Sequence, residues 1–124
     1  MSAELQNYKS QKAAMAAANK VRKQLIAPQA WTAHAMLCHE LDDDRWIWGL
    51  THNTVDLERI TLEYYPSTKQ YQAATLIDNE DYGCVEADAD PQQAAERLLA
   101  RLIEGRRQQL ETLTASLHTV QGLQ

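Results

Sequence analysis

Phenylalanine is absent from this sequence of 124 residues, and glycine, proline and cysteine are scarce, with four, three and two residues. Three tryptophans and five tyrosines must therefore supply the aromatic volume of a core. Because the four glycines are isolated, the chain has no glycine-rich loop of the kind that binds phosphate. No apolar run approaches the roughly 18 residues that a membrane span requires, so we expect no membrane partner.

The two cysteines, Cys38 and Cys84, and the N-terminal residues bear on the cellular compartment. Residues 1–4 lead into a polar, lysine-rich stretch without the apolar segment that is typical of signal peptides. We therefore expect a cytoplasmic protein whose cysteines are reduced thiols. The length fits one domain spanning residues 1–124, and we expect no cofactor.

Charge is distributed unevenly along the chain, although the net charge is only −5. Residues 1–39 have a balance of +4 and residues 97–124 one of +2. Residues 40–96 carry 14 acids against three bases, a balance of −11. Such asymmetry bears on solubility and partners rather than on fold. We interpret the lysines from Lys9 to Lys23 as a solvated helix face, so nucleic acid is not the expected partner.

Helices are predicted at both ends of the chain. Residues 3–26 are rich in alanine, lack glycine and proline, and carry one apolar stripe, which ends at Ala27-Pro28. The C-terminal helix is predicted over residues 91–120. The start of this helix has the clearest N-terminal capping pattern in the sequence, with Asp90 as the cap and Pro91 at the first helical position.

Strands are predicted in the region between the helices, at about residues 31–89. Apolar and polar residues alternate from Arg45 onward, residues 60–77 resemble a hairpin, and residues 84–90 alternate again. Residues 28–41 fit either a helix, from their content of alanine, leucine and methionine, or a strand, which their alternation favours. The predicted fold is α+β, with an antiparallel sheet of three to five strands and long N- and C-terminal helices packed on one face.

The end of the predicted C-terminal helix carries leucines that a domain of this size is too small to cover. An unbroken helix over residues 91–120 would be about 45 Å long. It must therefore either fold back at Gly105, where it is expected to weaken or break, or pack against another chain. We predict a homodimer formed through an apolar stripe at heptad-like spacing: Leu110, Leu113, Leu117 and Val120.

One local stretch resembles a known family. The run from Gly83-Cys84-Val85 through Asp90-Pro91-Gln92-Gln93-Ala94 is similar to the strand-to-helix joint of HicB-type antitoxins, and the preceding hairpin lies where that family has one. The resemblance covers about residues 60–104. It implies a β-β-β-α unit and an acidic protein that neutralises a basic one. The family's hairpin usually opens the chain, whereas nearly 60 residues precede it here, and no C-terminal DNA-binding module is evident.

Two hypotheses for function follow. The first is a non-catalytic, acidic inhibitor or antitoxin-like protein that binds a basic, nucleic-acid-handling protein. Its partner-binding residues would be acids from three segments around the sheet: Asp42, Asp43, Asp44, Asp78, Glu80, Asp81, Glu86 and Asp88.

The second hypothesis is a small metal- or ligand-binding protein, or an enzyme, built on His34, Cys38 and His39. On a helix, His34 and Cys38 would share a face and could ligate one zinc ion, with His52 as a further ligand. On a strand the same two residues lie about 13 Å apart, too far for one ion. The first hypothesis, without a metal and without catalysis, is the prediction.

Overall fold

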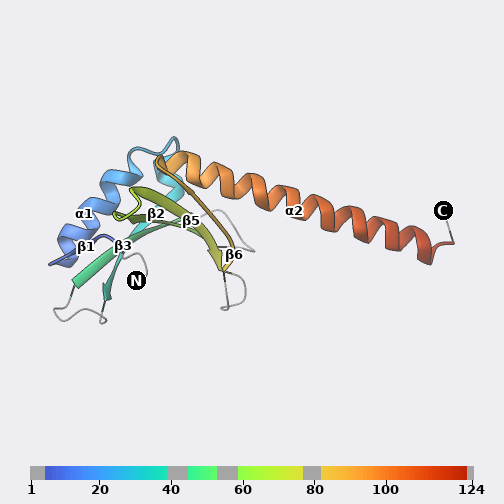
Figure 1. The fold of residues 1–124 in the computed structure, drawn as a ribbon, viewed down its shortest axis with the longest axis horizontal. Helices are drawn as coiled ribbons and strands as arrows, with labels where there is room; N and C mark the ends of the chain where they lie inside the picture. Colours follow the sequence, from blue (N-terminus) through green and yellow to red (C-terminus); the bar gives the residue numbers. More distant parts are fainter. Residues whose placement is uncertain (1–4, 39–44, 53–58, 77–81, 123–124) are drawn as a thin grey trace.

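The computed structural model describes residues 5–38, 45–52, 59–76 and 82–122 of the chain. Within these ranges, six strands, two α-helices and one short 3-10 helix follow in this order: β1 Asn7–Tyr8, α1 Gln11–Arg22, η1 Pro28–Ala30, β2 Trp31–Cys38, β3 Arg45–His52, β4 Arg59–Tyr65, β5 Gln70–Leu76, β6 Tyr82–Asp88 and α2 Pro91–Val120. The fold is therefore α+β, as predicted (Figure 1). Neither described helix is long and apolar enough to cross a membrane.

The six strands form one antiparallel sheet in the order β1-β3-β4-β5-β6, with β2 also paired to β3. The predicted hairpin is confirmed, because β4 pairs with β5 from Arg59↔Leu76 to Tyr65↔Gln70. The prediction of three to five strands is too low. β1 was missed because its two residues were assigned to the N-terminal helix, whereas they pair with the first half of β3.

The ambiguity at residues 28–41 is resolved in favour of the strand over its described part. Pro28 opens a single 3-10 turn, and β2 then pairs with all eight residues of β3, from Trp31↔His52 to Cys38↔Arg45. The alternation of apolar and polar side chains predicted this element correctly, whereas helix propensity did not, since strand stability comes from cross-strand packing.

The N-terminal helix is shorter than the predicted residues 3–26. It begins after Ser10, whose hydroxyl oxygen accepts a hydrogen bond from the Ala13 amide at 3.1 Å, and its last residue is Arg22. A serine that satisfies a free amide in this way marks a helix start. The residues before Ser10 are thereby released to form β1.

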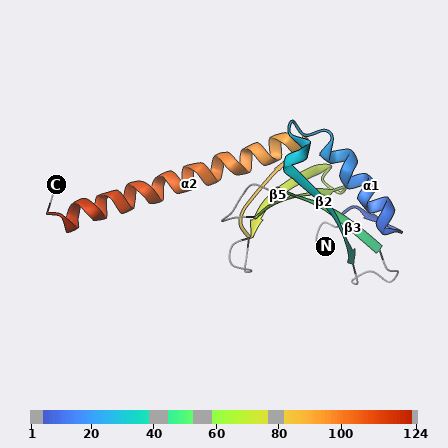
Figure 2. The ribbon, with the colours of Figure 1, turned by 180° about the vertical axis from the view of Figure 1, so that it is seen from behind.

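Both helices lie on the same side of the sheet (Figures 1 and 2). Helix α1 contacts β2 and β3, and the start of α2 contacts β5 and β6. The core lies between these helices and the sheet, and its largest fully buried apolar side chains are Leu50, Ile60, Leu62 and Leu98. Trp48 is only 3% exposed, so the tryptophans serve the core as expected.

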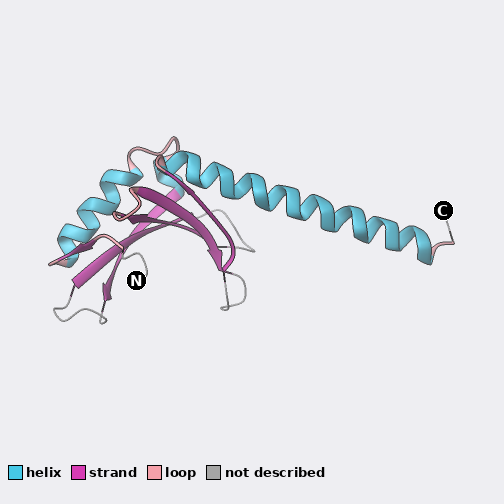
Figure 3. Ribbon diagram, in the orientation of Figure 1, coloured by secondary structure: helices cyan, strands magenta, loops and turns pink. Residues whose placement is uncertain are grey.

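Helix α2 has the predicted bounds, Pro91–Val120. The Asp90 carboxylate accepts a hydrogen bond from the Gln93 amide at 3.1 Å, which confirms the predicted cap. The expectation of a break is wrong, because the helix continues through Gly105 without interruption, and a weakening at this glycine stays a prediction. The prediction that this helix packs on one face of the sheet is confirmed only in part. Only its first turns do so, and the rest extends away from the sheet (Figure 3).

Candidate functional site

The candidate site is the projecting part of α2, residues 103–120, which we call the arm. Every side chain of the arm is exposed. Figures 1 and 2 show it extending beyond the sheet in two opposite views. Its 18 residues span about 27 Å. A helix that packs against no other element has little stability in water, because most helical stability in proteins comes from packing of an apolar face. The described residues of the chain provide the arm with no such packing.

One side of the arm carries five exposed apolar residues, which we call the stripe. Their exposed fractions are 67% for Ile103, 64% for Leu110, 66% for Leu113, 54% for Leu117 and 85% for Val120. They follow one another at steps of seven, three, four and three residues. These steps are those of the a and d positions of a heptad, with one such position, between Ile103 and Leu110, occupied by Arg106.

The four residues predicted for self-association therefore share one face, as the heptad spacing requires. Sequence analysis did not include Ile103 among the self-association residues. The seven-residue step from Ile103 to Leu110 was the signal that could have added it. Leu98, five positions earlier, is fully buried, so the helix passes from core to solvent within little more than one turn.

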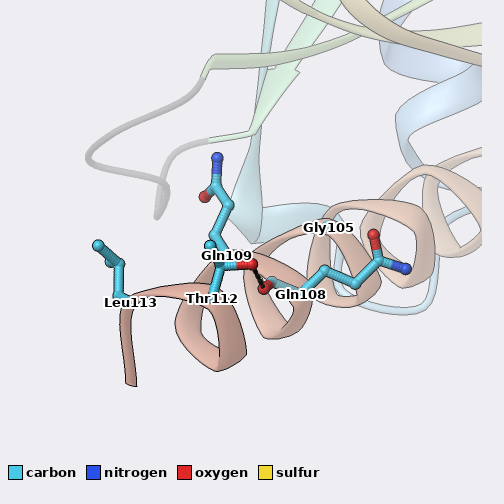
Figure 4. A pocket seen from close by; sticks show the side chains of 5 residues that line it. All are labelled: Gly105, Gln108, Gln109, Thr112 and Leu113. Atoms are coloured by element: carbon cyan, nitrogen blue, oxygen red, sulfur yellow. Dashed lines mark hydrogen bonds between the residues drawn. The ribbon is translucent and has the colours of Figure 1, made fainter. Parts of the chain in front are cut away.

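Gly105 produces a shallow depression on the arm beside the stripe (Figure 4). Apart from Gly105, its chain neighbours and the nearby backbone of the helix, no described atom lies within 4 Å of the position that a Cβ would take there. The depression is lined by Gln108, Gln109, Thr112 and Leu113 in addition to this glycine. The Thr112 hydroxyl donates to the Gln108 carbonyl at 3.1 Å, a bond within the helix. The depression is an open surface of one helix and contains the stripe residue Leu113.

Two of the eight acids predicted to bind a partner form ion pairs within the chain. Glu86 on β6 accepts from Arg101 at 2.9 Å and lies 3.6 Å from Arg97. Asp88 lies 3.4 Å from Arg97 and accepts a hydrogen bond from the Asp90 amide at 2.9 Å. These ion pairs join the start of α2 to the edge of the sheet. Because the arginines are more than half exposed, each pair contributes at most about 1 kcal/mol. The remaining six acids lie outside the described residues: Asp42, Asp43, Asp44, Asp78, Glu80 and Asp81.

The residues of the metal hypothesis are not brought together where the structure describes them. His34 and Cys38 lie four positions apart on β2, a separation of about 13 Å along a strand. The His34 Nε2 atom lies 2.9 Å from the Thr51 hydroxyl, and the His52 ring packs edge-on against Trp31 at 4.9 Å between centroids. His39 lies outside the described residues. Within the described ranges, no group of three or more potential ligands could hold a metal ion.

Comparisons of the chain with protein-family models, with curated proteins and with solved structures found no match of any kind. The function must therefore be argued from the geometry of this chain.

Proposed function

We propose that this protein is a non-catalytic interaction protein that works as a homodimer, in which the arm of one copy packs against the arm of a second copy. The observation that carries this proposal is the stripe, five apolar side chains that are each more than half exposed at heptad spacing. A helix with such a stripe is stabilised when the stripe is buried against another helix.

The energy available from the stripe is sufficient for association. Full burial of one such side chain contributes about 1.5–3 kcal/mol, and roughly two thirds of each side chain is still exposed to solvent. Each residue would then contribute about 1–2 kcal/mol, and the ten residues of a dimer about 10–20 kcal/mol. This range overlaps the upper part of the estimated cost of association, about 4–15 kcal/mol, and extends above it.

Two features favour a second copy of the chain as the occupant. A two-fold dimer requires a surface that is complementary to itself, and a regular heptad stripe meets this requirement. The charges of the arm balance, with two acids and two arginines, so the arm offers no surface of one sign to a strongly basic or acidic protein. Its arginines are Arg106 and Arg107, and Arg107 pairs with Glu104 on the same helix.

The orientation of the two arms follows from Arg106. In a parallel pair in register, this arginine would face its own copy within the stripe, and like charges would repel each other. In an antiparallel pair centred between Leu110 and Leu113, Arg106 faces Leu117, and its aliphatic stem can cover that leucine. We therefore propose an antiparallel dimer with the two sheets at opposite ends.

The partner of this dimer is proposed to be a protein with a basic surface. The support is the balance of −11 over residues 40–96. Since Glu86 and Asp88 are already paired with arginines, the proposed contact falls on Asp42–Asp44 and on the acids of residues 78–81. A surface of one charge steers association with a surface of the opposite charge.

The test of the dimer is the change Leu113→Ala, measured by sedimentation equilibrium over a range of protein concentrations. Leu113 is 66% exposed, so its loss should weaken each side of the interface by about 1.3 kcal/mol. A dimer contains the change twice, and the dissociation constant should therefore rise about 100-fold.

Gln108→Ala is the matched control, because Gln108 is exposed and lies on the side of the arm opposite Leu117. It should leave the dissociation constant within about a factor of three. Equal dissociation constants for Leu113→Ala and the wild-type protein would contradict the proposal.

A further inference from the structure

A second concave site lies between α1, β1 and the sheet, apart from the arm. Its volume is about 240 Å³. Helix α1 contributes one wall, and the strands β3, β4 and β5 contribute the floor and the opposite wall. The lining residues are Gln6, Tyr8, Ala17, Lys20, Val21, Gln24, Trp48, Tyr64 and Tyr71. Sequence reasoning missed this site because its residues come from five separate elements.

Aromatic rings form much of the lining, and they hold one another in place. The rings of Tyr64 and Tyr71, cross-strand partners on β4 and β5, have centroids 4.8 Å apart and are tilted by 51°. The Trp48 indole N–H lies close enough to the Tyr8 phenol to lower its pKa, against the larger opposite effect of burial. Trp48 is 3% exposed and Val21 is 8% exposed, so the floor is fixed by the core. The cavity is therefore largely preformed, as ligand sites usually are.

The polar groups around these rings include several hydrogen-bond donors. The amide groups of Gln6 and Gln24 and the ammonium group of Lys20 lie in the lining, and Lys20 is the one charged residue among those that line it. Burial raises the pKa of Tyr71, and the negative charge of Asp90 raises this pKa further. Burial also raises the pKa of Tyr8. Both phenols are thus neutral at physiological pH and can donate hydrogen bonds.

We propose that this cavity binds a small aromatic carboxylate with a single ring. A cavity of about 150 Å³ accommodates benzene, so 240 Å³ has room for one ring and a carboxylate group. The ring would lie against Tyr64, Tyr71 and Trp48. The carboxylate would face Lys20, which matches its single negative charge, and would accept hydrogen bonds from the glutamine amides. This inference rests on the cavity alone and is independent of the dimer.

The experiment is a titration of the isotopically labelled full chain with sodium benzoate, followed by the chemical shifts of backbone amides. Benzyl alcohol serves as the neutral probe and benzylamine as the cationic one. Saturable shifts at Tyr8, Val21, Tyr64 and Tyr71 are expected with benzoate. Benzoate should bind more tightly than either comparison compound. No saturable shift at these amides, or equal binding of all three compounds, would overturn the proposal.

Two variants distinguish benzoate binding in the cavity from nonspecific binding to the protein surface. Ala17→Leu places a larger side chain in the cavity and should abolish the benzoate shifts. Ala16→Leu, the same change at the neighbouring exposed position of α1, should leave them unchanged. Circular dichroism checks that both variants are folded. Lys20→Gln should weaken benzoate about two- to fivefold, as expected for an exposed charge pair, without affecting benzyl alcohol. Wild-type affinity in Ala17→Leu would place the binding elsewhere and contradict the proposal.

Discussion

Gly49 provides a sharp test of the view that His34 is a packing residue rather than a metal ligand. Gly49 is buried in the middle of β3 and is the cross-strand partner of His34 on β2. A Cβ added at Gly49 would lie 2.6 Å from Cε1 of the His34 ring and 3.1 Å from its Nε2 atom. The ring thus occupies the space that a side chain at position 49 would need. It is held there by the contact of Nε2 with the Thr51 hydroxyl at 2.9 Å.

The change Gly49→Ala should therefore destabilise the protein. Overpacking of this kind costs about 1–3 kcal/mol, and displacing the ring also weakens a hydrogen bond worth about 1 kcal/mol. Replacing a strand glycine by alanine also stabilises the folded chain by about 0.5–1 kcal/mol, which offsets part of this loss. The net loss is about 1–3 kcal/mol, which corresponds to a fall in Tm of several degrees for a chain of this size.

Urea denaturation of a double-mutant cycle provides the assay. In the His34→Ala background the ring is absent, so Gly49→Ala should be neutral or stabilise by about 0.5 kcal/mol. The coupling between the two positions should thus be about 1–3 kcal/mol. An equal loss of stability from Gly49→Ala in both backgrounds would refute the assigned packing role of His34.

Three further predictions concern charge and assembly. Burial raises the pKa of Glu63 in the folded chain, so Glu63→Gln should stabilise the protein at pH 7. This gain should vanish below about pH 4, where the carboxyl group is protonated in both states, and a constant gain from pH 7 to pH 3 would contradict it. A mixture of Leu110→Cys and Leu113→Cys chains should form disulfides between the two variants under mild oxidation. Bridges between identical variants, mapped by mass spectrometry, would indicate a parallel dimer instead. Changing Asp42, Asp43 and Asp44 to lysine should slow binding to a basic protein partner in a salt-dependent manner, and an unchanged association rate in stopped-flow measurements would argue against an acidic contact.

The sequence predicted those parts of the fold that depend on local patterns. The alternation of apolar residues located the strands, and Asp90 with Pro91 located the start of α2. What it could not predict depends on contacts distant in sequence. The two residues of β1 are too few to show a period, and they are held by pairing with β3. Gly105 was expected to interrupt α2, but a glycine in a helix costs only about 1 kcal/mol, which does not by itself end a helix.

The candidate sites also divide into features that local sequence patterns predict and features that depend on contacts distant in sequence. The stripe was predicted from heptad spacing, since the spacing alone places its residues on one face. The pairing of Glu86 and Asp88 with arginines was not predicted, because it requires α2 to cross β6. The aromatic cavity was also not predicted, since its walls meet only when β1 pairs with β3 and α1 packs on the sheet.

The mass of the wild-type protein in solution tests the central claim, that the arm is a self-association surface, most directly. Sedimentation equilibrium at high micromolar concentration should give a mass near twice the 14.1 kDa of one chain, and dilution should return it toward 14.1 kDa. Circular dichroism at the same concentrations should show helix content falling as the dimer dissociates, because a free arm is marginally stable. A mass of 14.1 kDa at every concentration would contradict the claim.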